Sequence, residues 1–245
     1  MDGSPPPLTR RAQLLGWLLD YAYVTRWTLR AVVGRSHPDR WLHPVAPRRT
    51  PVLLIPGVFE TWRFLQPVAE HLHRRGHPVH VLAELGWNTR AIPELAALVA
   101  AHLEREDLHD VVVVAHSKGG LIAKQAFGQP GTLDRVRHVI AIGTPFSGSR
   151  YAALFLLPSV RMFAPRGPVI RALALETAVN RRISSLYSVF DPHIPETSRL
   201  EGAENVVLPT VGHFRPLGDP RTLALVTAIL DRAVAGAGEV PEPPG

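Results

Sequence analysis

The sequence predicts an α/β fold in which a doubly wound, mostly parallel sheet is flanked by helices. Short, wholly apolar stretches alternate along the chain with longer stretches of helical periodicity. Strands that are apolar on both faces are typical of parallel sheets covered by helices on each side. With 245 residues, 46% of them hydrophobic, the chain is long enough to bury a full core as one domain.

The expected elements follow one another in a regular order. Turn residues separate them, such as Gly76 after one helix and Pro192 after one strand. Strands are expected at residues 51–55, 79–83, 111–115, 137–142, 183–190 and 204–208, and helices at 12–33, 64–75, 92–106, 119–127 and 223–234. Reactive side chains then belong at the carboxyl ends of the strands, where the crossover loops converge.

Three boundaries divide the chain. Residues 1–34 are expected to form a tail and an amphipathic helix, residues 35–235 the α/β domain, and residues 236–245 a disordered tail. Within the domain, residues 151–182 form an insertion that contains the apolar runs AALFLLPSV and VIRALAL. We interpret this insertion either as a short helical lid over an acyl pocket or as cap helices that pack on the core.

Composition excludes several classes of function. The formal net charge is +6, but the arginines are scattered from Arg10 to Arg232 and form no basic run interleaved with aromatic residues. Nucleic acid is therefore not expected as a partner. The chain has no Cys, which excludes disulfides, thiol catalysis and Cys-based metal sites.

The mostly apolar stretch at 12–33 could be mistaken for a membrane span. Asp20, Arg26 and Arg30 interrupt it, so the longest clean run, 14–19, is too short to cross a bilayer. Arg10 and Arg11 faintly resemble a twin-arginine export signal, but no small-x-small cleavage site follows. A cytoplasmic or peripheral membrane location is therefore favoured over export.

One side of this expected helix is apolar enough to need a partner. Its residues are Leu14, Leu15, Leu18, Tyr21, Ala22 and Thr25. We interpret this helix either as packed on the body of the domain or as an interfacial helix in peripheral contact with a lipid surface.

The run VVVVAHSKGG, residues 111–120, is typical of a nucleophile elbow. An apolar, β-branched strand leads into Ser117, and a helix-compatible stretch follows directly. In such a turn the serine hydroxyl stands clear of the backbone, and the flanking positions must be small. Ala115 and Gly119 meet that requirement, although Ala115 replaces the more usual Gly. Ser117 is the predicted nucleophile.

A serine hydroxyl attacks an acyl carbon usefully when an imidazole takes its proton and a carboxylate orients that imidazole. In the predicted fold the order along the chain is Ser, acid, His. Asp191 follows the strand ISSLYSVF, and His213 follows the last strand in TVGHFRPL. Each therefore lies at a strand end, and Ser117, Asp191 and His213 form the predicted triad.

Other titratable residues compete for these roles. Glu84 follows its own strand and is the second candidate for the acid, whereas Asp219 lies beyond the histidine. His116 precedes the nucleophile and is expected to pack sideways. His193 is too close in sequence to Asp191 to be its partner but could line the site.

A tetrahedral intermediate needs two fixed N–H donors. The backbone N–H of Lys118, directly after the nucleophile, is one predicted donor. The second is expected from the loop IPGVFE after the first strand, where Gly57 permits the turn and Val58 N–H faces the site. Phe59 is the neighbouring alternative.

These stretches together resemble the α/β-hydrolase superfamily, in particular its small lipase and esterase branch with an AHSxG elbow. The matching segments are LLIPGVFETW, VVVVAHSKGGLIAK, VIAIGTPFSGS, ISSLYSVFDPHIP and NVVLPTVGHFRPL. Phe146 stands where that branch commonly has a His, and Pro56 where it often has one before Gly57. The resemblance implies an α/β-hydrolase fold with a cap insertion and ester hydrolysis through an acyl-enzyme, without a metal or cofactor.

The expected function is a lipase or carboxylesterase acting on an ester or lipid substrate. An acyltransferase or thioesterase would use the same triad, and a ligand-binding member of the fold without activity is the alternative from another class. Phe59, Phe146, Leu154 and Leu157 are the predicted substrate-pocket residues. With the apolar run that also contains Phe155 and Leu156, they favour a lipid-like acyl chain if the insertion is a lid.

Overall fold

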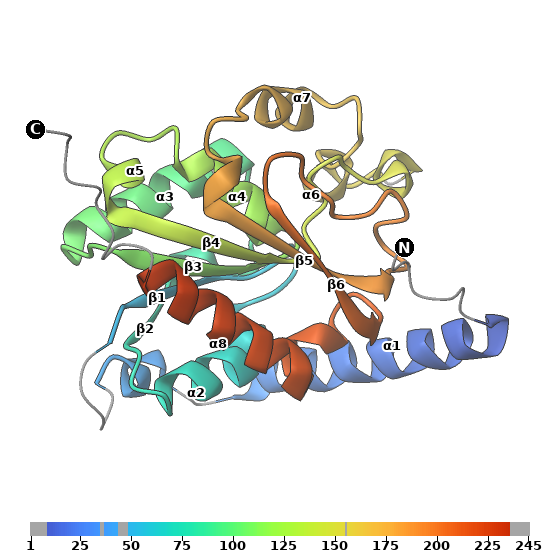
Figure 1. Ribbon diagram of the computed structural model, residues 1–245. Helices are drawn as coiled ribbons and strands as arrows, with labels where there is room; N and C mark the ends of the chain where they lie inside the picture. Colours follow the sequence, from blue (N-terminus) through green and yellow to red (C-terminus); the bar gives the residue numbers. More distant parts are fainter. Residues whose placement is uncertain (1–8, 35–36, 44–48, 155, 236–245) are drawn as a thin grey trace, which may run out of the picture.

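A six-stranded, all-parallel sheet forms the centre of the protein in the computed structural model, which describes residues 9–34, 37–43, 49–154 and 156–235 (Figure 1). The strands are β1 (Val52–Ile55), β2 (Val79–Val81), β3 (Val111–His116), β4 (Val136–Ile142), β5 (Ile183–Phe190) and β6 (Glu204–Val211). Their order is β2-β1-β3-β4-β5-β6, and every neighbouring pair is parallel. The predicted doubly wound parallel sheet is confirmed.

The strand order changes direction between β1 and β3. The chain leaves β1 toward β2 at one edge and returns to place β3 on the other side of β1. Loops that follow two such strands turn away from each other and leave a crevice at the carboxyl edge of the sheet. The loop after β1 and the turn after β3 therefore border the same crevice.

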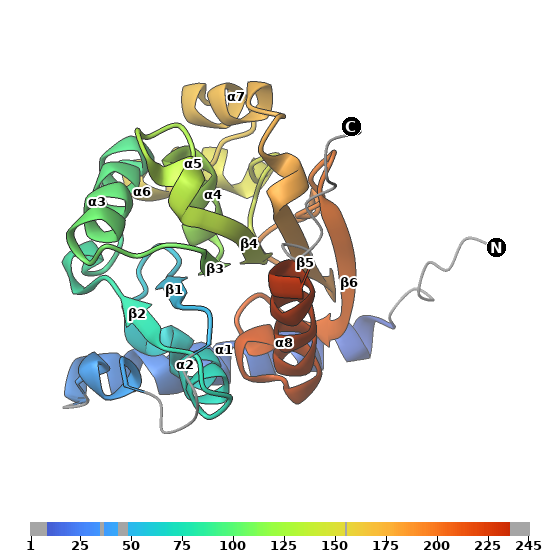
Figure 2. The same ribbon diagram turned by 60° about the vertical axis from the view of Figure 1, so that its left-hand side comes forward.

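Helices cover both faces of the sheet (Figure 2). The α-helices are α1 (Arg10–Val33), α2 (Gln66–His73), α3 (Ile92–Arg105), α4 (Lys118–Ala126), α5 (Thr132–Arg135), α6 (Pro158–Arg161), α7 (Pro168–Leu175) and α8 (Pro220–Ala235). One layer contains α3 and α4, and the opposite layer contains α2 and α8, with α1 running along its outside.

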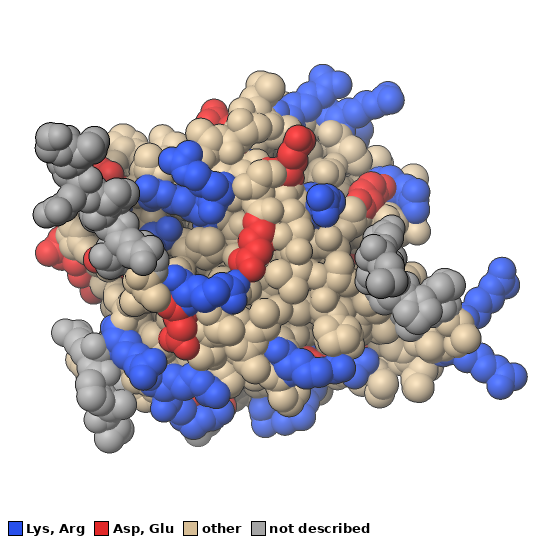
Figure 3. All heavy atoms as spheres, viewed as in Figure 1, with Lys and Arg blue, Asp and Glu red and all other residues tan. Residues whose placement is uncertain are grey.

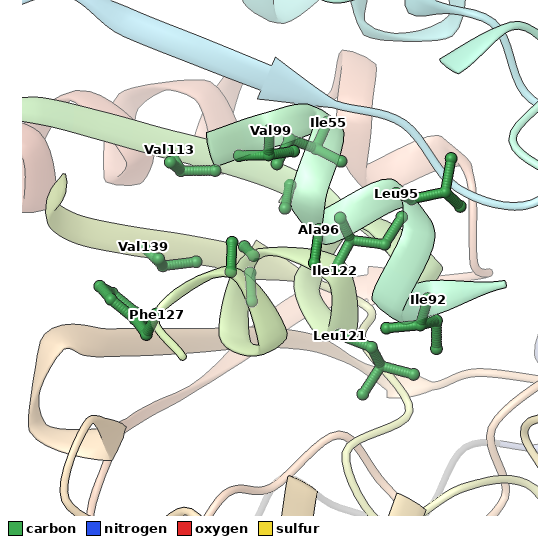
Figure 4. Packing of buried hydrophobic residues seen from close by; sticks show 14 of the residues in the cluster. Ile55, Ile92, Leu95, Ala96, Val99, Val113, Leu121, Ile122, Phe127 and Val139 are labelled. Atoms are coloured by element: carbon green, nitrogen blue, oxygen red, sulfur yellow. The ribbon is translucent and has the colours of Figure 1, made fainter. Parts of the chain in front are cut away.

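Each strand feeds two hydrophobic cores because its side chains alternate between the two faces. In β3, Val111 and Val113 pack in the α3–α4 layer, whereas Val112 and Val114 pack in the α2–α8 layer. All four side chains are fully or almost fully buried. Figure 4 shows the first core, where Leu95, Val99 and Ile122 of the helices meet Val113 and Val139 of the sheet. Burial on both faces explains why these strands are apolar throughout.

The helix α1 packs against the body through one side only. Its buried residues are Gly16, Asp20, Trp27 and Ala31, and it contacts β6 and the two 3-10 helices at Trp62–Leu65 and Arg215–Gly218. A Cβ atom at Gly16 would collide with Val211 of β6, so α1 lies very close to the end of that strand. No helix of the described residues is long and apolar enough to cross a membrane.

The side of α1 that the sequence analysis singled out faces away from the body. Leu14, Leu15 and Leu18 are each more than half exposed, and Tyr21 is 43% exposed. The helix is packed on the body of the domain, as one of the two interpretations expected, but the contact is made by the opposite side.

The insertion forms short helices rather than long ones. It contains a 3-10 helix at Arg150–Leu154, then α6 and α7, and a 3-10 turn at Asn180–Arg182. Ile170 and Leu173 of α7 are buried in the α3–α4 core, while Leu156 and Leu175 are highly exposed. Phe155 lies outside the described residues, as do residues 1–8 of the expected N-terminal segment and the expected tail at 236–245.

Most predicted elements agree with the structure to within a few residues. The expected helix at 64–75 is instead a 3-10 turn, Trp62–Leu65, followed by α2, because Pro67 lacks the N–H that a longer α-helix would use there. The last strand continues to Val211 instead of ending at 208, and α8 begins earlier, at Pro220.

Candidate active site

Ser117 lies in the sharp turn between β3 and α4. Its backbone angles are φ 51° and ψ −120°, a combination that is strained for any residue with a side chain. A hydrogen bond of 2.9 Å from its N–H to the carbonyl of Ile142 on β4 holds this turn against the sheet. The turn therefore has the geometry of a nucleophile elbow.

Small residues after the serine are required by close backbone contacts. A Cβ atom at Gly119 would lie too close to the carbonyl oxygens of Ile55 and Pro56, and one at Gly120 would collide with the side chain of Thr144. Helix α4 therefore starts immediately beside the end of β1. This packing aims the first N–H groups of α4 at the carboxyl edge of the sheet.

Asp191 and His213 form a direct hydrogen bond at the neighbouring strand ends. His213 Nδ1 donates to Asp191 Oδ2 over 2.7 Å, and both side chains are buried, with 5% and 7% exposure. Asp191 follows β5 and His213 follows β6, so two adjacent strands bring them together. This arrangement fixes which nitrogen of the ring carries the proton facing the carboxylate.

The charges in this pair reinforce each other. Burial alone would lower the pKa of His213, but the Asp191 charge and their hydrogen bond outweigh it, so the pKa is raised. Burial would raise the pKa of Asp191, but the charge of His213 and the hydrogen bonds that Asp191 accepts hold it below its usual range. The backbone N–H groups of His193 and Ile194 donate to Asp191 Oδ1 over 2.8 and 3.2 Å. Asp191 is thus an ionised acceptor on both oxygens.

Ser117 and His213 line the same pocket. Within the described part of the chain, the Ser117 hydroxyl and the His213 ring are not joined by a hydrogen bond, and the bond of that ring is the one to Asp191. Catalytic hydrogen bonds are often long or poorly aligned until substrate binds.

Two of the predicted backbone donors are available and the third is not. Neither Val58 N–H nor Lys118 N–H is hydrogen-bonded to any residue that the structure describes. Phe59 N–H donates to the carbonyl of Trp87 over 2.8 Å, and Phe59 itself has a φ of 59°. The alternative that Phe59 supplies the donor is therefore wrong, because that loop turns its N–H away.

The Lys118 side chain is a structural element that the sequence analysis left without a role. It is fully buried, and its ammonium group donates to the carbonyl oxygens of Asn88 and Arg90. Burial, followed by the nearby Arg90 charge, lowers its pKa to about 8. Asn88 in turn donates to the carbonyl of Pro56 over 2.6 Å, so Lys118 ties the loop after β1 to the elbow.

His116 packs sideways, as expected, and belongs to a buried polar network. Its Nδ1 lies 2.8 and 2.9 Å from the two carboxylate oxygens of Glu60, and its Nε2 lies 3.1 Å from the carbonyl of His213. Glu60 also accepts from Gly57 N–H over 2.7 Å. The network connects the loop after β1, the elbow and the His213 loop.

Asp20 of α1 is the residue at this site that the sequence analysis missed. It is fully buried, its Oδ2 accepts from His213 N–H, and its Oδ1 accepts from Phe214 N–H and Arg215 N–H, each over 2.8 Å. A carboxylate in the middle of an apolar helix was the available signal, since a buried charge needs partners. It was used only as evidence against a membrane span.

A pocket of about 990 Å³ opens over these residues. Its walls come from α1, the insertion and the segments that follow all six strands. They consist of Trp17, Tyr21, Val24, Thr28, Val58, Phe59, Glu60, Phe64, Trp87, Ser117, Pro145, Ser149, Tyr151, Ala152, Leu154, Val160, Phe163, Pro192, His193, Ile194, His213 and Phe214. Apart from Ser117 and the groups around His213, this lining is predominantly apolar and aromatic.

Two of the four predicted pocket residues line this pocket. Phe59 and Leu154 do so. Phe146 instead packs into the α3–α4 core with 5% exposure, because the loop after β4 turns its ring inward beneath the insertion. Leu157 precedes α6 and lies outside the lining, with 54% exposure. For Phe146 and Leu157 the predicted position was wrong.

The competing acids lie elsewhere. Glu84 is exposed and pairs with Arg105, and Asp219 pairs with Arg221. Neither lines the pocket. His193, by contrast, does line the pocket. Burial, followed by the charge of His213, lowers the pKa of His193 to about 4. Tyr21 Oη lies 3.2 Å from His193 Nε2.

One group among the described residues has the composition of a metal site. Ligand atoms of Asp191, His193 and His213 lie within 4.8 Å of one another. A metal ion there would have to replace the short hydrogen bond between Asp191 and His213, which already satisfies both groups. The donor set therefore fits a proton-transfer pair better than a metal centre.

The shape of the molecule is similar to that of solved hydrolases. A lipase of Bacillus licheniformis, BlEst2 in its mature form, is 16% identical with a TM-score of 0.62, over 77% of this chain and 94% of the lipase. A structure from work on carboxylesterases of the thaumarchaeon Nitrososphaera gargenis is 13% identical with a TM-score of 0.59, over 77% of this chain and 92% of the other. An extracellular α/β-hydrolase of a Paenibacillus species is 17% identical with a TM-score of 0.54, over 75% of this chain and 98% of the hydrolase.

No protein-family model and no curated protein matches the sequence. The structural likenesses nevertheless agree in one respect: these neighbours are described as lipases, esterases or α/β-hydrolases. The chain has the α/β-hydrolase fold, and the prediction of that fold is confirmed.

Proposed function

We propose that this chain, with its α/β-hydrolase fold, is a serine hydrolase that cleaves carboxylic esters. The observation that carries the proposal is the buried 2.7 Å bond between Asp191 and His213 beside a serine on a strained elbow, all at one pocket. A positioned carboxylate, imidazole and hydroxyl are the components of nucleophilic acyl transfer.

In the proposed reaction, Ser117 Oγ attacks the ester carbonyl while His213 Nε2 takes its proton. The charged imidazole is stabilised by Asp191, which already accepts from Nδ1. Collapse of the intermediate breaks the bond to the alcohol, which leaves with the proton returned by His213. Water then attacks the acyl-enzyme by the same route and restores Ser117.

The backbone N–H groups of Val58 and Lys118 are the proposed donors to the developing oxyanion. Both come from the two loops at the crevice between β1 and β3, and both are without other hydrogen bonds to described residues. Losing one such donor typically costs about 10²- to 10³-fold in turnover. The ties from Lys118 and Asn88 between these loops support a fixed spacing of the two donors.

The apolar lining favours a substrate with a lipid-like acyl chain over a small polar ester. The pocket has about 990 Å³ and carries Leu154, Val160 and Phe163 from the insertion. On p-nitrophenyl esters of increasing chain length we expect hydrolysis to rise toward intermediate or long chains. Rates that fall steadily with length would contradict this specificity while leaving hydrolysis itself supported.

A fluorophosphonate probe tests the proposed nucleophile directly. We expect covalent labelling of the full chain, loss of labelling in Ser117→Ala, and peptide mapping of the probe to residue 117. An unlabelled protein, or equal labelling of the Ser117→Ala variant, would favour the ligand-binding alternative. Adding acceptor alcohols or thioesters to the assay separates a hydrolase from an acyltransferase or thioesterase with the same triad.

A further inference from the structure

Helix α1 has an apolar side that nothing in the described structure covers. We call this side the outer face; it consists of Leu14, Leu15, Leu18, Leu19, Leu29, Val32 and Val33. Exposures of its members range from 45% for Leu19 to 73% for Val33. Side chains at these spacings lie on one side of an α-helix, here in two groups, residues 14–19 and residues 29–33.

The opposite side of α1 makes the contacts with the body of the domain. Gly16, Trp27 and Ala31 are buried against the body, and Trp17 and Tyr21 form part of the pocket wall between the two sides. Large apolar side chains gathered on an exposed surface mark a site of contact with a partner or a membrane. The outer face is therefore a candidate for such a contact.

Charge identifies the kind of environment. The exposed charges of α1 are all positive; they belong to Arg10, Arg11, Arg26 and Arg30. The one acidic residue of this helix, Asp20, is buried and accepts hydrogen bonds from three backbone N–H groups. Figure 3 shows basic side chains projecting from the N-terminal end of α1, at the right of the view. An exposed apolar helix face whose helix carries only positive charges at its surface matches the interface of a membrane that contains anionic lipids.

We propose that the outer face of α1 docks on an anionic lipid bilayer, with the helix lying in the plane of the surface. Leucine and valine side chains enter the acyl boundary, while the arginines contact phosphate groups. Because Trp17 and Tyr21 line the pocket from the same helix, docking brings the pocket entrance close to the lipid. This surface is independent of the proposed chemistry, since none of its residues lines the pocket.

Vesicle sedimentation of the full chain tests the docking. We expect the protein to bind phosphatidylcholine vesicles that contain phosphatidylglycerol about tenfold or more tightly than vesicles of phosphatidylcholine alone. Added salt should weaken this binding, because it screens exposed charges. Binding to both vesicles with equal affinity, or to neither, would overturn the proposal.

Two double variants locate the contact. Leu18→Glu with Leu29→Glu places charges on the outer face and should lower binding by about tenfold or more. The matched control, Leu133→Glu with Leu175→Glu, changes exposed leucines on α5 and α7, in the layer opposite α1, and should bind like the wild type. Hydrolysis of a soluble short-chain ester should be unchanged in both.

A second copy of the chain is the competing occupant of this face. Light scattering of the free protein distinguishes it, because docking on lipid predicts a monomer. A dimer that the outer-face variant dissociates would overturn the proposal, as would vesicle binding that the variant leaves unchanged.

A different observation carries a second inference, which rests on the proposed function. The geometry assigns Asp20 as a positioning residue for His213. Its carboxylate accepts from three successive backbone N–H groups, those of His213, Phe214 and Arg215. Gly212 before them has a φ of 113°, and a Cβ atom there would collide with Asp20. The carboxylate thus fixes the start of the loop that carries the His213 ring.

Asp20→Asn tests this role because the amide replaces one acceptor oxygen by a donor that faces a backbone N–H. We expect kcat to fall about 10²-fold, the typical cost of a displacement of about 1 Å, with KM little changed. Because the Asp20 charge raises the pKa of His213, the acid limb of the pH–rate profile should also move to lower pH. Asp219→Asn, which breaks a surface pair with Arg221, is the matched control and should change neither quantity.

An NMR signal that does not depend on turnover tests the positioning role of Asp20 separately from the proposed hydrolysis. The proton on His213 Nδ1 in the short bond to Asp191 should give a low-field NMR signal, absent in Asp191→Asn. In Asp20→Asn we expect that signal to shift or broaden. An unchanged signal, together with wild-type kcat and pH profile, would overturn the positioning role even if hydrolysis is established.

Discussion

The Ser117 elbow and the His213 loop lie at the same edge of the sheet but are held in different ways. The elbow is built from consecutive residues: a buried strand, the serine, and glycines that allow α4 to start against β1. The His213 loop follows β6, an edge strand in which exposed and buried residues are mixed. Its backbone is held by Asp20, which lies 193 residues earlier in the chain.

This difference shows that the proposed active site combines a locally encoded part with a part that depends on distant contacts. The elbow needs only the central strands, which are the most deeply buried in the protein. The His213 loop needs the N-terminal helix to be docked as well, since three of its N–H groups point at α1. Changes in the two regions should therefore affect activity and stability in different proportions.

The largest expected effect isolates the chemistry of the elbow from its folding. Ser117→Ala should lower kcat by about 10⁶-fold, because it removes the nucleophile. Thermal stability should stay nearly unchanged, since alanine carries the same backbone strain and Ser117 makes no side-chain hydrogen bond to a described residue. Steady-state kinetics and a thermal melt measure both, and residual activity near wild type would remove Ser117 from the proposed mechanism.

The next effect addresses the pair at the His213 loop. Asp191→Asn should lower kcat by about 10⁴-fold, because the amide no longer holds the required tautomer or stabilises the charged ring. Glu84→Gln is the matched control: this carboxylate is exposed and paired with Arg105, so its loss should leave kcat unchanged. If Glu84→Gln were the inactive variant instead, the assignment of the acid would be reversed.

A substitution in the elbow that leaves the chemistry untouched tests its packing. Gly119→Ala should lower the free energy of unfolding by about 1–3 kcal/mol, because the new methyl group meets two backbone carbonyls that cannot move aside. Gly128→Ala at the end of the same helix meets one atom at an ordinary distance, 3.4 Å, and should be nearly neutral. Denaturant titration of both variants measures the difference; equal stabilities would show that the elbow is less tightly packed than described.

The smallest expected effect is a shift in the pH at which activity is half lost on the acid side. His213 must be neutral to act as a base, and its pKa is raised above the ordinary value of 6.5 by Asp191. The acid limb of kcat/KM should therefore have its midpoint above pH 6.5, with activity lost as pH falls through that midpoint. A pH–rate profile of the wild type checks the sign, and a midpoint below pH 6.5 would contradict it.

The sequence alone determined the strand pattern and the order of the site residues. Segments buried on both faces are apolar, so β1, residues 111–115 of β3 and residues 139–142 of β4 were recognisable from their composition. The elbow was equally recognisable because its requirements, a serine between small residues after a buried strand, lie within ten residues. Parallel strands then imply that residues following β5 and β6 meet at the same edge, which placed Asp191 and His213 together.

Only the tertiary structure decided which side chains face the site and what holds them. Phe146 turns into the core and Phe59 turns its N–H toward Trp87, because loop conformations depend on neighbours that are distant in sequence. Likewise α1 has large apolar residues both on the side that packs and on the side that is exposed, so its composition did not distinguish the two. That distinction came from Asp20, whose buried charge requires the three N–H groups that only the folded His213 loop provides.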